Sequence, residues 1–253
     1  MGAGVLLHGR DPEKCRTVRD EIWEASGNPK LEYYVADFSS LPDVRHMAAS
    51  VLESHERLDI LINNAGVFPA SSVNDQRFLS AQGHDLCFAV NYLAPFLLTH
   101  LLLPCLQAAN NPTVVNVVSA AQESIDFENI MLMDDYSPMR AYAQSKLALT
   151  MFTFEMHDRL KDKNIRVNCL HPGSLLDTKM VREAFSEPLG SAESGAEAEV
   201  HLATSPDVEN VSGAYFEAMR PAKAHSQAYD QQARQKLWQL SLRLTDLETQ
   251  LNV

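Results

Sequence analysis

The sequence lacks three features that would point to particular classes of protein: an excess of basic residues, clustered metal ligands and a long hydrophobic run. Lys and Arg number 21 against 33 Asp and Glu, a net charge of −12 that predicts repulsion of a nucleic-acid backbone. The longest apolar stretch, residues 92–106, contains Thr, His and Pro and is too short to cross a bilayer. We therefore expect neither nucleic-acid binding nor a membrane span.

Cysteine is also scarce. The four thiols belong to Cys15, Cys87, Cys105 and Cys169, and none forms a CxxC pair or has the spacing of a metal site. This pattern favours reduced, buried thiols in a cytoplasmic protein and gives no reason to expect a metal.

The sequence does contain apolar runs that alternate with helical patterns, and 45% of its 253 residues are hydrophobic. We predict strands at residues 5–7, 31–36, 58–62, 114–118, 165–170 and 212–216. We predict helices at residues 12–26, 43–56, 81–107 (interrupted near Pro95) and 140–161, with an amphipathic C-terminal helix at 227–250. Asp11 and Pro12 are typical of an N-cap and a first helical position. This alternation predicts an α/β fold, a single Rossmann-like domain over residues 1–253 whose doubly wound parallel sheet has helices on both faces.

Polar or glycine-containing turns follow four of these strands. They are Asp37, the run Asn63, Asn64, Ala65 and Gly66, then Ser119, and finally Pro172 with Gly173. Because ligands of open parallel sheets bind beyond the carboxyl ends of the strands, we expect these turns to border one site.

Tyr142 and Lys146 are four residues apart in a predicted helix, 23 residues beyond Ser119. Positions i and i+4 share a helix face, so the phenol and the amine can serve one pocket. A neighbouring cation favours the phenolate, and lowering a phenol pKa by about 3 units takes roughly 4 kcal/mol. The pair suits proton transfer to or from an alcohol or carbonyl oxygen.

In this order, the Asn-Asn-Ala-Gly run, Ser119, the Tyr-x-x-x-Lys pair and the Pro-Gly pair resemble the classical short-chain dehydrogenase/reductase family over essentially the whole chain. Asn91 stands where that family keeps a helix asparagine. The stretches at residues 212–216 and 237–241 further resemble the branch of the retinol dehydrogenases and the WW-domain-containing oxidoreductase. The resemblance implies NAD(P)-dependent interconversion of an alcohol and a carbonyl compound.

The resemblance also implies roles for the catalytic candidates. Tyr142 is the acid/base, Lys146 modulates its pKa and bonds the nicotinamide ribose, Ser119 holds the substrate oxygen and Asn91 places a water in the proton relay. Taken without the resemblance, Ser119 could equally cap a strand end, and Asn91 could bond backbone. Asn116 reads as structural, and His171 as a hydrogen-bonded histidine rather than a base.

The resemblance implies cofactor contacts for a larger set of residues: Asp37 and Phe38 beside the adenine, Asn64, Ala65 and Gly66 along the adenosine ribose, and Pro172, Gly173 and Thr178 at the nicotinamide. Thr178 lies one residue later than the family pattern. An acidic residue at position 9 would bind a free ribose 2′-hydroxyl, but Gly9 stands there and Arg10 offers a guanidinium suited to a 2′-phosphate. NADP is therefore favoured over NAD.

The family's first strand, its glycine-rich turn and its first helix have no counterpart in this sequence, a stretch of roughly 30 residues judged from βαβ unit size. Their absence would open two edges in the sheet and remove the helix terminus that binds the pyrophosphate. We expect the given sequence to be an N-terminally truncated form of the sequence of an active enzyme. The alternatives are a natural short form with impaired cofactor binding, or a non-catalytic binding or scaffold protein.

The substrate itself is not readable from the sequence. Residues 183–200, with Phe185 and Leu189 among small residues, predict a mobile lobe with helical pieces over a moderately apolar carbonyl or alcohol ligand. The broad apolar faces of the helices at 81–107 and 140–161 leave a homo-oligomer and a monomer equally open.

Overall fold

The computed structural model describes residues 2–69, 76–185 and 187–248. The strands are β1 (Val5–Gly9), β2 (Leu31–Val35), β3 (Ile60–Asn63), β4 (Thr113–Val117), β5 (Arg166–His171), β6 (Tyr215–Glu217) and β7 (Arg220–Ala222). The α-helices are α1 (Pro12–Ser26), α2 (Leu41–Ser54), α3 (Leu86–Phe88), α4 (Ala94–Leu101), α5 (Leu103–Gln107), α6 (Pro138–Leu160), α7 (Lys179–Ala184), α8 (Ala192–Thr204) and α9 (Gln231–Leu244). A π-helical turn spans Ala89–Leu93, and short 3-10 turns span Lys161–Lys163, Pro206–Val208 and Ser226–Tyr229.

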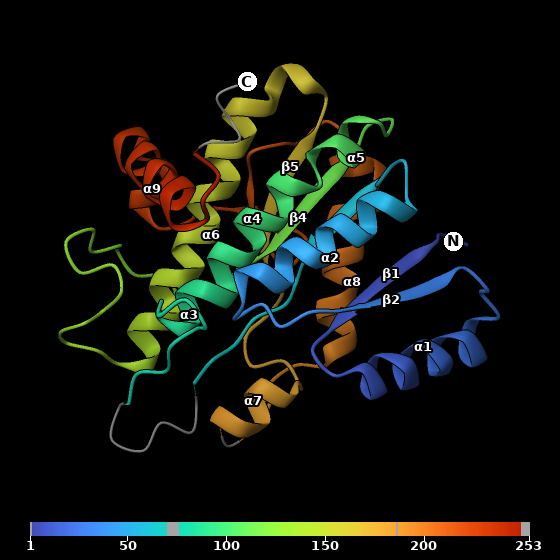
Figure 1. Ribbon diagram of the computed structural model, residues 1–253, viewed down its shortest axis with the longest axis horizontal. Helices are drawn as coiled ribbons and strands as arrows, with labels where there is room; N and C mark the ends of the chain where they lie inside the picture. The colour runs from blue at the N-terminus through green and yellow to red at the C-terminus, as the bar shows by residue number, and fades with distance from the viewer. Residues whose placement is uncertain (1, 70–75, 186, 249–253) are drawn as a thin grey trace.

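The strands form two sheets. β1 and β2 pair in parallel, and the second sheet has the order β3-β4-β5-β6-β7, parallel except for the antiparallel pair β6 and β7. Figure 1 shows β1 and β2 beside α1, on the side of the molecule away from α9. Within the described residues no strand joins β1 to β3, so the break falls where the resemblance places the absent strand.

The central strand β4 is buried along its whole length, as expected for a parallel strand covered on both faces. Val114 packs in the larger hydrophobic cluster with α2, α4, α6 and α9, whereas Val115 and Val117 pack in a second cluster with α8. This alternation confirms the predicted parallel sheet with helices on both faces.

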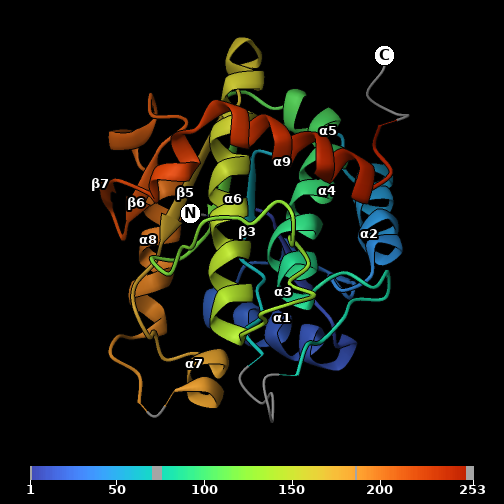
Figure 2. The ribbon, with the colours of Figure 1, turned by 90° about the vertical axis from the view of Figure 1, so that its left-hand side faces the viewer.

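The apolar face of α4 and α6 is covered by α9 of the same chain, which crosses them in Figure 2. Phe96 on α4 lies at the centre of this contact, with ring centroids 5.2 Å from Phe152 of α6 and 5.3 Å from Trp238 of α9. Phe96 is fully buried, so packing within the chain accounts for the apolar face.

Local capping explains where several helices begin. Asp11 accepts hydrogen bonds from the backbone N–H groups of Glu13 and Lys14, which confirms it as the N-cap of α1. α2 begins at Leu41 rather than at the predicted residue 43, because Ser40 is its N-cap.

Three predicted segments need correction. The helix predicted from residue 81 begins at Leu86, where Asp85 caps it, then passes through the π-helical turn and breaks again at Leu102. The C-terminal helix begins at Gln231, because Asp230 caps it after a 3-10 turn, and ends at Leu244; the predicted end at Gln250 lies outside the described residues.

The strand predicted at residues 212–216 is shorter than expected and is not the last one. β7 was not predicted, because its central residue is Pro221, which a sheet tolerates only at an edge.

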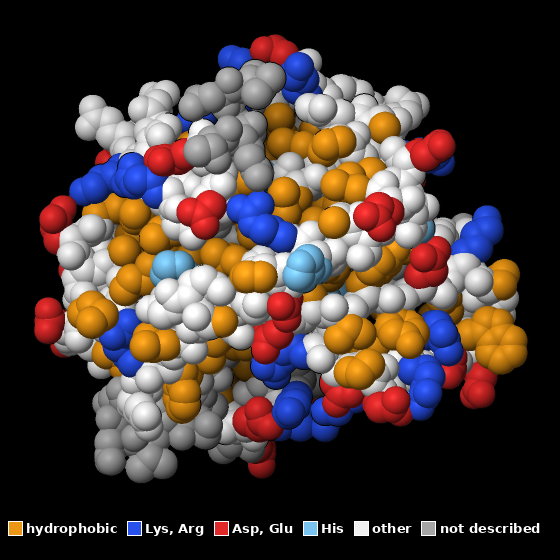
Figure 3. Space-filling model, in the orientation of Figure 1, with side chains coloured by type: hydrophobic (Ala, Val, Ile, Leu, Met, Phe, Trp, Pro, Cys, Tyr) orange, Lys and Arg blue, Asp and Glu red, His pale blue; other side chains and the backbone are white. Residues whose placement is uncertain are grey.

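On the face shown in Figure 3, acidic and basic side chains are interspersed and hydrophobic side chains reach the surface between them. Across the described part of the chain, no helix has both the length and the apolar character needed to traverse a bilayer.

Candidate active site

Turns from three strand ends meet at one pocket of about 560 Å³. The predicted site residues that line it are Asn64 and Gly66 after β3, Ser119 after β4, Tyr142 and Lys146 on α6, Pro172 and Gly173 after β5, and Thr178 at the start of α7. The pocket therefore lies at the carboxyl edge of the larger sheet, on the side of α7 in Figure 1.

Ser119, Tyr142 and Lys146 form the polar centre of the pocket. The phenol of Tyr142 faces the side chain of Ser119, whose hydroxyl acts to lower the phenol pKa. The Lys146 amine lies 5.7 Å from the centre of the Tyr142 ring and donates a 2.8 Å hydrogen bond to the carbonyl of Val117. Ser119 Oγ also accepts the N–H of Ala121 at 3.1 Å, so this serine caps the strand end and faces the phenol as well.

Burial controls the electrostatics of this centre. Removal from water raises the pKa of Tyr142, and the Ser119 hydroxyl opposes that rise. Burial also lowers the pKa of Lys146 to about 8, against the opposing charges of Cys87 and Glu199. The Tyr142 shift is opposite to the direction expected from the Tyr–Lys spacing, because desolvation of the phenolate outweighs the opposing influence of Ser119.

Asn91 lies behind the pocket rather than in its lining, fully buried in the π-helical turn. Its Oδ1 accepts the N–H of Val67 at 2.7 Å, and its Nδ2 donates to the Val67 carbonyl at 3.0 Å and to Ser145 Oγ at 2.9 Å. Ser145 Oγ donates in turn to the carbonyl of Tyr142 at 2.7 Å. Asn91 thereby ties the loop after β3 to the helix that carries the phenol, and π-turns are frequent at such sites.

Gly66 leaves room for a ligand beside the amine. A Cβ atom at this position would lie 3.3 Å from both Asn91 Oδ1 and Lys146 Nζ, so a side chain would intrude between the loop and α6. A backbone without a side chain can approach a bound sugar closely. This geometry fits the ribose side of a nicotinamide cofactor.

The other predicted cofactor residues lie outside this pocket lining. Arg10 is exposed after β1, and Asp37 is half-buried, with a carboxylate that accepts the N–H of Ser39 at 2.9 Å. Phe38 is buried and stacks on His8 at 3.9 Å between ring centroids. Ala65 is half-buried between the two lining residues Asn64 and Gly66.

Gly9 has a packing role that the sequence did not reveal. A Cβ atom here would lie 2.6 Å from the Cys15 sulfur, so a larger residue would force the Cys15 side chain at the start of α1 to shift. Helix packing thus explains the glycine without reference to the choice of cofactor.

Two further expectations concerned polar residues near strands. Asn116 is structural as predicted, since it accepts from Asn63 at 2.8 Å and donates to Thr153 at 2.9 Å in the core. His171 lines the pocket but is hydrogen-bonded to Ser174 at 3.1 Å, and burial lowers its pKa.

Residues 174–185 and 187–190 lie beside the pocket, and two backbone hydrogen bonds join their ends. The N–H of Leu189 donates to the carbonyl of Leu175, and the N–H of Asp177 donates to the carbonyl of Gly190, both at 2.8 Å. The predicted lobe does contain helical pieces, α7 and the start of α8. Thr178 caps α7 through a 3.4 Å bond from Val181 N–H while it also lines the pocket.

Sequence reasoning missed Phe68 and Glu199. The Phe68 ring lies 5.4 Å from the ring of Tyr142 and 5.6 Å from that of Phe185, which makes an apolar wall beside the phenol. Glu199 reaches the pocket from α8, where burial raises its pKa to about 7 and the charge of Lys146 opposes the rise. The position of Glu199 within α8 could have indicated its helix face. That position predicts a pocket residue only when the face of α8 that packs on the sheet is known.

Replacing Glu199 with Gln is expected to remove one source of pH-dependent stability. The folded protein holds a proton on Glu199 up to about pH 7, whereas the unfolded chain releases it near the ordinary value of 4.5. This contribution to stability is therefore full below pH 4.5 and is lost as the pH rises through 7. Discounted for partial exposure, we expect an effect on the order of 1 kcal/mol.

Thermal unfolding of wild type and Glu199→Gln across this pH window tests that expectation. Glu197→Gln, an exposed position on the same helix, is the matched control. Identical pH dependence in wild type and Glu199→Gln would contradict the assignment.

The family model described as short chain dehydrogenase matches residues 1–189. Retinol dehydrogenase 13 of Mus musculus is 36% identical over 263 aligned residues, which cover 97% of this chain and 77% of that protein. A solved protein from Mycobacterium paratuberculosis has a TM-score of 0.76 and 28% identity, covering 96% of this chain and 84% of that one. A short chain dehydrogenase from Shigella flexneri 2a, solved in complex with NADP, has a TM-score of 0.68 and 25% identity, covering 85% and 86%.

Proposed function

The chain belongs to the short-chain dehydrogenase family, in the branch of the retinol dehydrogenases, and from this we propose that it interconverts an alcohol and a carbonyl compound with a nicotinamide cofactor. The observation that carries the proposal is the meeting of Ser119, Tyr142 and Lys146 in one pocket. Turnover of a panel of aldehydes, ketones, steroids and retinoids with NADPH tests it, and the absence of turnover across the panel in a form that binds cofactor would contradict it.

Each polar group of the pocket has a part in the proposed reaction. The cofactor, when bound, supplies or accepts the hydride. In the reducing direction the Tyr142 hydroxyl gives its proton to the substrate oxygen, which Ser119 holds by a hydrogen bond. The Lys146 ammonium favours the resulting phenolate and binds the nicotinamide ribose, and Asn91 places a water that returns a proton to the phenol.

The cofactor contacts follow the chain along the sheet edge. Pro172, Gly173 and Thr178 would hold the nicotinamide, and Asn64, Ala65 and Gly66 the adenosine ribose. Asp37 and Phe38 would hold the adenine. A side chain at Gly66 would narrow this part of the pocket, because its Cβ atom would lie 3.3 Å from the Lys146 amine.

NADP is the proposed cofactor because Arg10 presents an exposed guanidinium after β1, where a 2′-phosphate can be bound. Replacing Arg10 with Ala is expected to raise KM for NADPH about tenfold or more relative to NADH, since a charge-assisted hydrogen bond is lost. Steady-state kinetics with both cofactors measure this ratio. Arg16→Ala on the exposed side of α1 is the control, and an unchanged ratio in Arg10→Ala would refute the choice of NADP.

The proposed substrate is apolar, because Phe68 and Phe185 pack beside the phenol. Replacing Phe68 with Ala is expected to raise KM roughly tenfold for a bulky apolar aldehyde and to change KM little for a small one, since only the bulky substrate loses buried contact. Phe127→Ala, an aromatic outside this pocket, is the control. Equal effects of Phe68→Ala on both aldehydes would mean that this ring does not contact substrate.

The separation of β1 and β2 from the larger sheet favours a second candidate function, a binding or scaffold protein with impaired cofactor binding. Titration of the 253-residue chain with NADPH, followed by nicotinamide fluorescence, distinguishes the two functions. Saturable binding counts against the scaffold function, and its absence supports it.

A further inference from the structure

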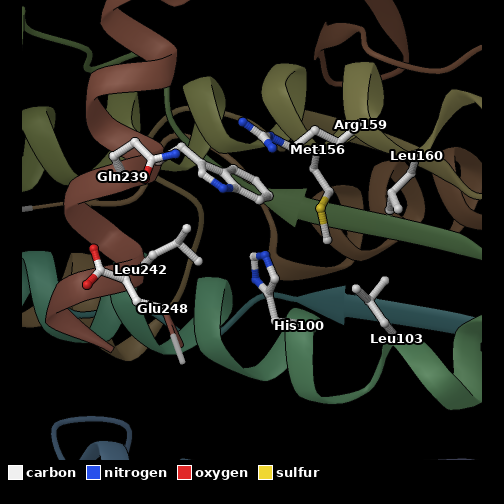
Figure 4. Close-up of a pocket in the computed structure, with 9 residues that line it drawn as sticks. His100, Leu103, Met156, Arg159, Leu160, Gln239, Leu242 and Glu248 are labelled. Carbon is white, nitrogen blue, oxygen red and sulfur yellow. The ribbon is translucent and has the colours of Figure 1, made fainter. Parts of the chain in front are cut away.

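A second cavity, of about 580 Å³, lies between α4, α6 and α9, away from the catalytic residues. Its apolar wall consists of Leu103, Met156, Leu160, Leu242 and Trp238, with Arg159, Gln239 and Glu248 toward its rim. Figure 4 shows His100 pointing from α4 toward the middle of this space. This volume falls within the range of small-molecule sites, which combine apolar walls with few polar groups.

His100 is the polar group at the centre of the cavity. It is 8% exposed, and its Nδ1 lies 2.7 Å from the carbonyl of Phe96. Since a carbonyl can only accept, Nδ1 carries the proton and Nε2 is left as an acceptor. Burial lowers the pKa of His100 to about 4, so the ring is neutral at physiological pH.

The Nε2 atom of His100 is buried and has no hydrogen-bond partner among the described residues. A buried acceptor without a donor costs free energy, so a bound molecule that supplies an O–H group would satisfy it. Both charged groups at the rim already have partners, because Arg159 is paired with Glu155 at 2.9 Å and stacks on Trp238 at 4.2 Å, and Glu248 lies 3.9 Å from Arg243. The cavity therefore suits a neutral ligand better than an anion.

We propose that this cavity binds a neutral, apolar alcohol or phenol whose hydroxyl donates a hydrogen bond to His100 Nε2 and whose body packs on Trp238 and Met156. The site is separate from the catalytic pocket and does not depend on the proposed reaction. It lies under the helix that covers α4 and α6, so a ligand here also contacts three of the helices that build the main core.

Trp238 provides a direct reporter of binding. The chain has two tryptophans, and Trp23 is exposed on α1, on the other side of the molecule from α9 in Figure 1. In a Trp23→Phe background, a bromine-labelled long-chain alcohol is expected to quench Trp238 fluorescence saturably. A bromoalkane of equal length, which lacks the hydroxyl, is expected to bind about tenfold more weakly.

Three variants decide between this site and the alternatives. His100→Phe is expected to abolish the preference for the alcohol, and Leu103→Phe, which fills the cavity while keeping His100, is expected to weaken both probes. Phe68→Ala, in the catalytic pocket, is expected to leave quenching unchanged. Thermal melts establish that each variant folds. If His100→Phe does not fold, the binding measured in Leu103→Phe tests the site instead.

Several results would overturn the proposal. Linear quenching without saturation, equal affinity for the alcohol and the alkane, or unchanged binding in Leu103→Phe would each exclude the site. Weakened quenching in Phe68→Ala would place the probe in the catalytic pocket instead. Because the assay needs neither cofactor nor turnover, its failure leaves the proposed oxidoreductase function untouched.

Discussion

Replacement of Tyr142 with Phe is expected to lower turnover by roughly 10²- to 10⁴-fold, the range attributed to a positioned acid or base. The variant removes only the hydroxyl that faces Ser119, and its ring keeps the edge contact with Phe68. Thermal unfolding should therefore change little. The rate is measured with saturating substrate and cofactor in a form of the protein that turns over.

Tyr33→Phe is the matched control, because Tyr33 is half-buried on β2 and lies outside the pocket lining. We expect that control to retain wild-type turnover. Undiminished turnover of Tyr142→Phe would remove the phenol from the reaction and, with it, the role given to Ser119.

Replacement of Lys146 with Met is expected to lower turnover by about 100-fold or more, because the cation that favours the phenolate is lost. Folding should not suffer to the same extent. Lys146 is 3% exposed, and keeping a charge in that position opposes folding, as its lowered pKa indicates. Met preserves the length and the apolar stem, and only the hydrogen bond to the Val117 carbonyl is lost.

The pH dependence of stability and of turnover provides a second test of the role of Lys146. The folded protein releases the Lys146 proton at about pH 8, whereas the unfolded chain holds it to about 10.5, so wild-type stability should rise with pH between these values. Turnover should fall over the same interval as the amine becomes neutral. Lys146→Met should lack the rise in stability, and Lys161→Met, at an exposed position, should retain it.

A Lys146→Met variant with wild-type turnover would show that the amine is dispensable. A wild-type rate that stays constant through pH 8 would show instead that its charge state does not matter. The Lys146→Met rate tests whether the amine is needed at all, and the wild-type pH profile tests whether its charge is needed.

Much of the candidate site could be read from spacing. The interval of four residues between Tyr142 and Lys146 fixes both on one side of α6, because an α-helix repeats every 3.6 residues. Parallel strands likewise bring the residues after β3, β4 and β5 to one edge, so Gly66, Ser119 and Pro172 could be grouped before the fold was known. Both inferences rest on the regular geometry of a helix or of parallel strands, which short-range backbone preferences set.

Other features could not be read in this way. Phe68 and Glu199 reach the pocket from a loop and from α8, and their contacts depend on how those segments pack against α6. The direction of the Tyr142 pKa shift was also misjudged, because desolvation depends on every atom that surrounds the phenol. The cavity around His100 needs three helices from distant parts of the sequence.

The sequence by itself determined the alternation of strands and helices, the caps at Asp11 and Pro12, and the order of the polar turns, since these follow from short-range periodicity and backbone preference. Only the tertiary structure decided that Asn91 anchors the loop after β3 and that α9 covers α4 and α6. These depend on contacts between residues far apart in the chain, whose energies arise from burial and shape that no local pattern encodes.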